Sequence, residues 1–157
     1  MIPESLPDCS GTYVLVLESC TFAELAIGRL GTLHLEPGCY LYVGSAFGPG
    51  GIAARVGRHA QTEKTARWHI DYLRERTRLV EVWYQCGDVH HEAQWAEVLA
   101  GMRGLRAPLA GFGASDGAPG ASHLFFARRC PTRQGFRQAL RRAGLPDADL
   151  RAVRIET

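Results

Sequence analysis

Residues 39–59 read CYLYVGSAFGPGGIAARVGRH and join a strand pattern, a glycine-rich turn and a helix pattern within 21 positions. The segment 39–44 is apolar and aromatic, which is typical of a strand. The run of three glycines and one proline over 48–51 predicts a turn. Apolar residues then return at helical spacing, as at Ile52 and Val56. We therefore expect a strand, a tight turn and a helix over 52–59.

The flanking sequence extends this pattern in both directions. Strands are predicted over 11–17, 29–35, 79–86 and 122–127, and helices over 65–76, 89–102 and 132–143. The segment 108–121 is rich in glycine and predicts an irregular loop. This order indicates a fold of the α/β class, more closely the α+β type: a small mixed, largely antiparallel sheet flanked by helices. A length of 157 residues favours a single domain over 1–157.

Composition and cysteine usage point to a compartment. The sequence is 46% hydrophobic but has no apolar run long enough to cross a bilayer, and its first residues lack a basic or hydrophobic leader. The five cysteines are odd in number and widely spaced, without a Cys-x-x-Cys pair. We expect a soluble, cytoplasmic protein with reduced, mostly buried cysteines and no membrane partner.

The net charge of +2 hides an asymmetry. Residues 1–127 carry ten basic and thirteen acidic side chains, whereas residues 128–157 carry eight arginines against three acidic residues. Arg133, Arg137 and Arg141 recur every four residues, which places them along one side of the predicted helix 132–143. Such a row of cations can contact nucleic-acid phosphates without reading sequence, and it can equally be a solvated face.

Two glycine patterns suggest other functions. Residues 48–53 match G-x-G-x-x-A, and Asp71 follows at about the spacing of a ribose-binding acid, so a dinucleotide-binding protein is one alternative. The missing βαβ alternation and the cationic helix that follows speak against it. Residues 113–117 match G-x-S-x-G of serine hydrolases, but they follow no predicted strand, and the Ala118-Pro119-Gly120 that comes next cannot start the helix which that motif requires.

A third pattern accounts for more of the chain. The tripeptide GTY at 11–13 lies in the first predicted strand, YVG at 42–44 ends a later strand, and the helix after it contains Arg55-x-x-Arg58-His59. With HIDYL at 69–73, Glu92, GFGASD at 111–116 and SHLF at 122–125, the sequence resembles the GIY-YIG nuclease superfamily, in particular its Uri-type branch. The resemblance spans about 11–127, which would form the nuclease core, with 128–157 as a basic helix and tail.

The resemblance implies a divalent-metal-dependent endonuclease that hydrolyses phosphodiester bonds, with DNA as the expected substrate. It implies one Mg²⁺ or Mn²⁺ ion held by Glu92, with Tyr13 as the general base and Arg55 as the stabiliser of developing charge. Tyr42, with His59 or His69, would orient water or phosphate, and Arg58 would contact nucleic acid. Both tripeptides must lie on adjacent strands, although 28 residues separate them.

Elementary geometry bears on these positions. Side chains alternate along a strand, so Tyr13 and Tyr42 share a face if their strands pair in a suitable register. Glu92 begins the otherwise apolar helical stripe of Trp95, Ala96 and Leu99, and a carboxylate facing inward needs a cation or hydrogen-bond donors.

Other residues are less decisive. His69 and Asp71 point to different sides of one helix, so they cannot both serve a single site from it. A non-catalytic nucleic-acid-binding protein on the same fold is the alternative from another functional class.

Overall fold

The computed structural model describes residues 6–61, 66–113 and 121–155. Their elements, in chain order, are β1 (Gly11–Ser19), β2 (Ala23–Ile27), β3 (Gly31–Leu35), β4 (Gly38–Ala46), α1 (Gly51–Ala60), α2 (His69–Arg74), β5 (Arg78–Cys86), α3 (Glu92–Ala100), β6 (Leu124–Ala127), α4 (Arg133–Arg142) and β7 (Arg151–Arg154).

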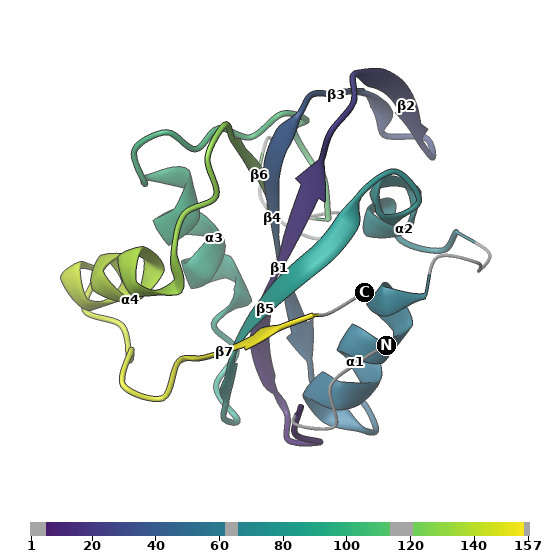
Figure 1. Ribbon diagram of the computed structural model, residues 1–157. Coiled ribbons are helices and arrows are strands. Elements are labelled where there is room, and N and C mark those ends of the chain that lie inside the picture. Colours follow the sequence, from purple (N-terminus) through teal and green to yellow (C-terminus); the bar gives the residue numbers. More distant parts are fainter. Residues whose placement is uncertain (1–5, 62–65, 114–120, 156–157) are drawn as a thin grey trace.

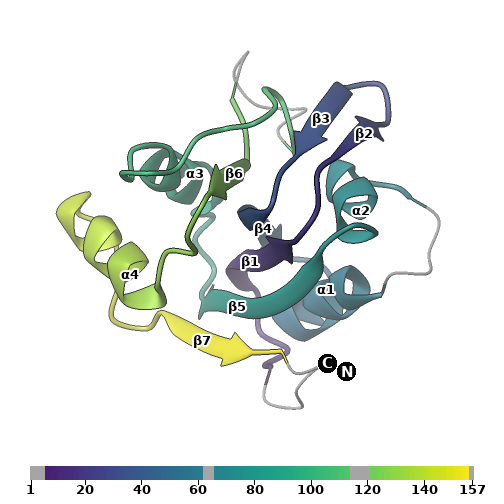
Figure 2. The same ribbon diagram turned by 45° about the horizontal axis from the view of Figure 1, so that its top comes forward.

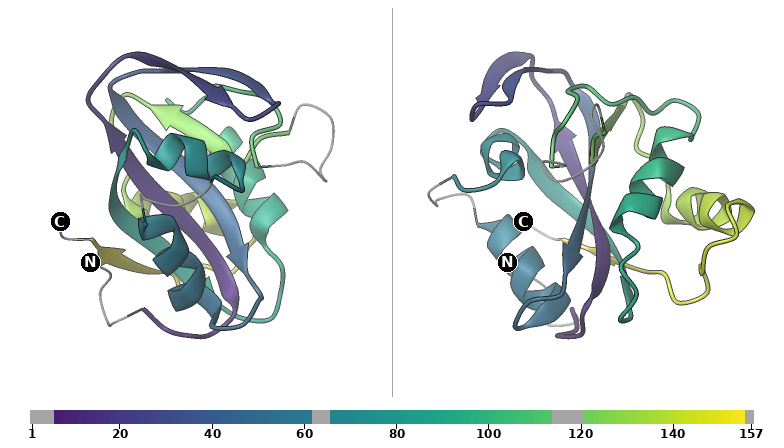
Figure 3. Two further views of the ribbon diagram at one scale, coloured as in Figure 1. Left: turned by 90° about the vertical axis from the view of Figure 1, so that its right-hand side faces the viewer. Right: turned by 180° about the vertical axis from the view of Figure 1, so that it is seen from behind.

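A five-stranded sheet of order β6-β4-β1-β5-β7 forms the middle layer (Figures 1 and 2). The helices α1 and α2 cover one face of this sheet, and α3 and α4 cover the other, as the view from behind also shows (Figure 3). Each face has its own apolar core: Leu15 and Val56 belong to the first, Trp83 and Phe136 to the second. The alternation of side chains along β1 produces this division, because Tyr13 and Leu15 face one core while Val14 and Val16 face the other.

The predicted α+β class is confirmed, but the strand pairing differs in detail. Every pair of strands described is antiparallel, so the sheet is antiparallel and not mixed. The strand predicted at 29–35 does not join this sheet, since β3 pairs with β2 in a separate hairpin. We did not predict β2 because its sequence, AELAI, consists mainly of good helix formers. We also missed β7, a four-residue edge strand with arginine at both ends.

Helix α4 is one residue shorter at each end than predicted, and α2 and α3 differ more. Helix α2 covers only His69–Arg74, and the start predicted at residue 65 lies outside the described residues. Helix α3 begins at Glu92 and not at residue 89: its N-cap is His91, and Val89 before it is exposed.

The prediction of reduced cysteines is wrong for four of the five. Disulfides join Cys9 to Cys86 and Cys39 to Cys130, and Cys20 is free and exposed. Strand pairing brings these partners together: Gly11 lies opposite Cys86 in the β1–β5 register, and Cys39 lies opposite Ala127 in the β4–β6 register. Disulfides persist in oxidising compartments, so the two pairs argue against the expected cytoplasmic location. Among the residues described, no helix combines the length and apolarity that crossing a membrane requires.

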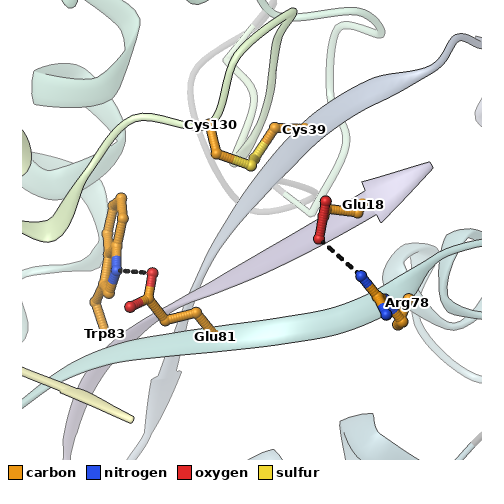
Figure 4. Close-up of a disulfide and its surroundings, with 6 residues drawn as sticks. All are labelled: Glu18, Cys39, Arg78, Glu81, Trp83 and Cys130. Atoms are coloured by element: carbon orange, nitrogen blue, oxygen red, sulfur yellow. Dashed lines mark hydrogen bonds and ion pairs between the residues drawn. A yellow bond between two sulfur atoms is a disulfide. The ribbon is translucent and has the colours of Figure 1, made fainter. Parts of the chain in front are cut away.

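Figure 4 shows the Cys39–Cys130 disulfide beside polar contacts on the neighbouring strands. The Trp83 indole N–H donates to Glu81 Oε1 at 3.0 Å, and Arg78 pairs with Glu18 at 3.2 Å between β5 and β1. The disulfide ties the first residues of β4 to the chain between β6 and α4, so this edge of the sheet is held covalently as well as by hydrogen bonds.

Candidate active site

The two tyrosines of the tripeptides meet on the α1 face of the sheet. Strands β1 and β4 pair directly, with Tyr13 opposite Gly44 and Tyr42 opposite Leu15. The tyrosines are therefore diagonal neighbours two rows apart, and both pack in the core beneath α1. Tyr13 is buried and Tyr42 is half-buried at the rim of a cavity. The adjacency that the resemblance requires is thus present in the fold.

Gly44 makes the position of the Tyr13 ring possible. A Cβ atom at Gly44 would lie 2.8 Å from Tyr13 Cε2 and closer still to the phenol oxygen. The ring of Tyr13 therefore occupies the space where any other residue at position 44 would have a side chain. Here glycine is required by close approach and not by its backbone angles.

Helix α1 brings two polar side chains to Tyr13. The Tyr13 hydroxyl lies 2.7 Å from Nε2 of the buried His59, and the charge of the Arg55 guanidinium lowers the pKa of the same phenol. His59 also contacts Tyr42, with ring centroids 6.0 Å apart. The inward stripe of α1, which begins with Ile52 and Val56, places these polar residues against the sheet.

Electrostatics link Glu92 to the same cluster, although α3 lies on the other face of the sheet (Figure 1). Burial raises the pKa of Tyr13 well above its ordinary value, and the Glu92 carboxylate raises it further while Arg55 lowers it. Burial likewise raises the pKa of Tyr42, again with Glu92 raising it and Arg55 lowering it. The Glu92 side chain is 32% exposed, so this carboxylate remains accessible from solvent while its charge acts on both phenols.

The sequence did not single out His123 as part of this region. Its Nδ1 lies 3.4 Å from Glu92 Oε2, and its side chain is 12% exposed. His123 precedes β6, and its backbone carbonyl accepts from the Val43 amide, one residue beyond Tyr42. The strand pattern of 122–125 is the signal that could have identified His123, because a strand there can pair with the end of the strand that contains YVG.

The residues present fit a single hard divalent cation. One accessible carboxylate is sufficient for Mg²⁺, which keeps several waters and takes substrate phosphate oxygens as ligands. Among the described residues, no group of three or more histidine, cysteine or acidic side chains could enclose a metal ion. A closed structural site of the zinc type therefore has no ligand set in this part of the chain, whereas the Glu92 carboxylate would be one protein ligand of an open site.

Asp71 has a structural role. It is buried, and its Oδ2 accepts from the Arg58 guanidinium at 2.7 Å and from the backbone amides of Arg67 and Trp68 at 2.8 and 2.9 Å. These contacts fix the start of α2 and hold Arg58 against it. They also argue against Asp71 as a ribose-binding acid.

The glycine-rich turn before α1 supports the same conclusion. Gly51 has φ +57°, and the amides of Ile52 and Ala53 donate to the carbonyls of Cys9 and Pro7. The first amides of α1 are therefore bonded to the N-terminal segment and not presented to a pyrophosphate. The dinucleotide alternative has no support in this geometry. Most of the serine hydrolase pattern, at 114–117, lies outside the described residues.

His69 and Trp68 form a second part of the region. Nδ1 of His69 accepts a hydrogen bond from the Gly113 amide at 2.9 Å. These two residues line a cavity of about 180 Å³ together with Tyr42, Arg67 and Trp68. The indole of Trp68 lies 4.9 Å from the Arg55 guanidinium and 4.3 Å from that of Arg58. Trp68 was not among the predicted site residues.

The predicted arginine row on α4 lies elsewhere. Helix α4 packs on the core opposite to the tyrosines, through Phe136 and Leu140. Arg137 and Arg141 both pair with Asp147, at 3.2 and 2.9 Å, and Arg133 donates to the Leu150 carbonyl at 3.4 Å. All three side chains thus make contacts within the C-terminal segment, and the row does not continue the surface of the tyrosine cluster.

Residues 12–145 match the family described as a domain of unknown function, DUF123. The chain belongs to this family. The match covers β1 through α4, so the tyrosines, Arg55, His59, the second cavity and Glu92 all lie within the DUF123 domain. No curated protein and no solved structure matches the chain.

Proposed function

We propose that this DUF123 protein is a divalent-metal-dependent endonuclease that hydrolyses phosphodiester bonds, with DNA as its substrate. One observation carries the proposal: an arginine, two tyrosines and a histidine converge on one face of a strand pair, and an accessible carboxylate acts on both phenols. The resemblance to the GIY-YIG nucleases supports it, since the same residue types stand in the same order.

The hydrogen bond between Tyr13 and His59 offers a path for a proton. Because burial raises the pKa of Tyr13, a standing phenolate is not populated near neutral pH. His59 Nε2 lies 2.7 Å away and can receive the phenol proton as the phenol oxygen takes one from an attacking water. In this scheme Tyr13 transfers a proton and His59 is the ultimate base.

Arg55 and Glu92 would stabilise the charge that develops in the proposed reaction, Arg55 directly and Glu92 by holding the metal ion. The Arg55 guanidinium can stabilise negative charge that develops on the phosphate oxygens, a contribution typically worth about 10²–10³ in rate. Glu92 would hold Mg²⁺ or Mn²⁺, which when bound supplies Lewis-acid stabilisation of the leaving oxygen. Tyr42, half-buried at the cavity rim, would orient the phosphate.

The test is cleavage of supercoiled plasmid and of labelled single-stranded, branched and duplex DNA, with Mg²⁺, with Mn²⁺ and with a chelator. Wild type is compared with Arg55→Ala and Glu92→Gln. Glu97→Gln is the matched control, because Glu97 is an exposed carboxylate on the same helix. We expect cutting only with metal, a loss of at least about 10²-fold in Arg55→Ala and Glu92→Gln, and normal activity in Glu97→Gln.

Two results would change this assignment. If every variant binds DNA equally and none cuts any substrate, the protein is a non-catalytic nucleic-acid-binding protein on this fold. If cutting persists in Glu92→Gln, Glu92 does not hold the metal.

A further inference from the structure

Apart from Tyr42, the residues that line the cavity beside Tyr42 have no role in the proposed reaction. Its lining consists of an aromatic pair, a histidine, an arginine and a backbone glycine: Tyr42, Trp68, His69, Arg67 and Gly113. Its volume of about 180 Å³ is below the range of sites for drug-sized ligands, so it suits one small planar ring. Tyr42 belongs to both this cavity and the proposed catalytic cluster, which makes the two adjacent.

His69, in the lining of this cavity, has one ring nitrogen that can donate a hydrogen bond. Its Nδ1 accepts from the Gly113 amide at 2.9 Å, so in the neutral ring the proton is on Nε2. Burial lowers the pKa of His69, which keeps the ring neutral near pH 7. A histidine in this tautomer cannot accept a proton at Nε2, but it can donate one hydrogen bond to a carbonyl or ring nitrogen of a ligand.

Gly113 is fitted to its place in this wall. Its φ is +70°, and a Cβ there would lie 2.9 Å from Tyr42 Cε1 and 3.4 Å from His123 Cβ. Only glycine allows the backbone to approach Tyr42 this closely while its amide reaches His69.

Trp68 combines an aromatic surface with positive charge. Its indole is half-buried, and Asp71 fixes its backbone amide at 2.9 Å. The guanidinium groups of Arg58, Arg55 and Arg67 lie 4.3, 4.9 and 5.8 Å from its ring. Aromatic side chains beside arginines are the combination with which proteins bind single-stranded nucleic acids, where the ring stacks on a base and the cations contact phosphate.

We propose that this cavity binds one unpaired nucleobase, with Trp68 as the stacking surface and His69 as the hydrogen-bond donor, and that the substrate carries an unpaired nucleotide beside the cleaved bond. The proposal rests on the proposed nuclease function and specifies its substrate class. A base within a duplex is stacked on both faces and paired along one edge, so it cannot enter a cavity of this size without being extruded. Single strands, flaps and bulges present such a base without that expense of free energy.

Intrinsic fluorescence provides a direct test, because Trp83 and Trp95 are fully buried whereas Trp68 is not. With chelator present to prevent cutting, a single-stranded oligonucleotide should change the emission, and a blunt duplex of the same sequence should not. An oligonucleotide with abasic nucleotides keeps every phosphate, so it should bind more weakly and leave the emission unchanged. Trp68→Leu should weaken binding of the intact single strand by about 5- to 150-fold.

His69→Phe keeps the ring and removes the donor. It should weaken binding of the intact single strand while leaving the abasic strand unaffected. Thermal melts of both variants verify that they remain folded, and Arg29→Ala, an exposed arginine on the loop between β2 and β3, is the matched surface control.

Trp68 also contacts Arg55, so a positioning role must be distinguished from base binding. If Trp68 only positions Arg55, Trp68→Leu will reduce cleavage of every substrate by one factor, and intact and abasic strands will bind wild type equally. That result overturns the base-binding proposal and leaves the nuclease proposal standing. If the wild type cuts nothing but discriminates intact from abasic strands as described, the nuclease proposal fails and the base-binding cavity stands. Absence of any DNA binding overturns both.

Discussion

Replacement of Gly44 by alanine tests whether the position of Tyr13 is as tightly determined as the structure indicates. The new Cβ would lie 2.8 Å from Tyr13 Cε2 and would overlap the hydroxyl, so the ring has to move. Tyr13 is only 1% exposed and its hydroxyl is bonded to His59, hence the ring cannot move without disturbing the core or that bond. Overpacking of this kind costs about 1–3 kcal/mol. For a chain of this size the melting temperature should fall by roughly 2–12 °C.

The effect on catalysis should exceed the effect on stability. A displacement of about 1 Å at a reacting group can cost about 10²-fold in rate, and Gly44→Ala shifts Tyr13, the group that would receive the water proton in the proposed reaction. Gly48→Ala is the matched control, because a Cβ there would find no heavy atom closer than the Arg55 Nη2 at 3.8 Å. Both variants are compared by urea denaturation and by initial rates of DNA cleavage under metal saturation.

A double variant separates steric displacement from a general effect of alanine in β4. Once Tyr13→Ala has removed the ring, adding Gly44→Ala should cost little further stability. The reasoning is refuted if Gly44→Ala matches Gly48→Ala in stability and rate, or if the penalty of Gly44→Ala persists in the Tyr13→Ala background.

Three further perturbations test individual contacts of the structure. Burial raises the pKa values of Tyr13 and Tyr42, so their contribution to stability is complete below the unfolded pKa near 10 and is lost as pH rises toward the folded values. Urea denaturation between pH 9 and 11 should show the free energy of unfolding falling by up to about 1.4 kcal/mol per pH unit for each tyrosine. Tyr42→Phe should remove the part of this fall that Tyr42 contributes. Asp71→Asn should destabilise the fold by about 1.5–3 kcal/mol, because a buried carboxylate that accepts from Arg58 and two backbone amides loses its charge; an unchanged denaturation midpoint would contradict this role. Cys39→Ser should lower the free energy of unfolding by about 2–5 kcal/mol under oxidising conditions, since the disulfide closes a separation of 91 residues. With reductant present the loss should be far smaller. Identical urea denaturation curves for wild type with and without reductant would show that the bond contributes nothing.

The sequence was most informative where the pattern is local. Alternation within β1 and β4 placed Tyr13 and Tyr42 on strands, and the helical stripe of α1 placed Arg55 and His59 near the sheet. What sequence could not provide is register. Only the pairing of Tyr13 with Gly44 makes the two phenols diagonal neighbours, and a shift by one residue would have sent one of them to the other core.

The contacts that were missed join residues distant in the chain. The pairing of Cys9 with Cys86 follows from the β1–β5 register and not from cysteine spacing. Asp147 lies beyond the end of α4, so the helical spacing of the arginines gave no sign that Arg137 and Arg141 share it as a partner. The helical stripe predicted only which side of α3 carries Glu92. It could not predict which face of the sheet α3 covers, because that depends on how the chain crosses the sheet and not on the helix itself.

The segment between the two tripeptides shows why linear spacing is a poor criterion for this arrangement. The 28 residues that separate them leave the β1–β4 pairing continuous over nine rows, because β2 and β3 form beyond the ends of those strands. The hairpin is also part of the fold, since Ile27, Leu33 and Leu35 are buried in the core beneath α1 and α2. Its apolar face therefore adds to the same core that holds the Tyr13 ring in place. A segment that lies beyond the ends of two paired strands leaves every pairing between them intact, and the relative position of Tyr13 and Tyr42 depends on those pairings.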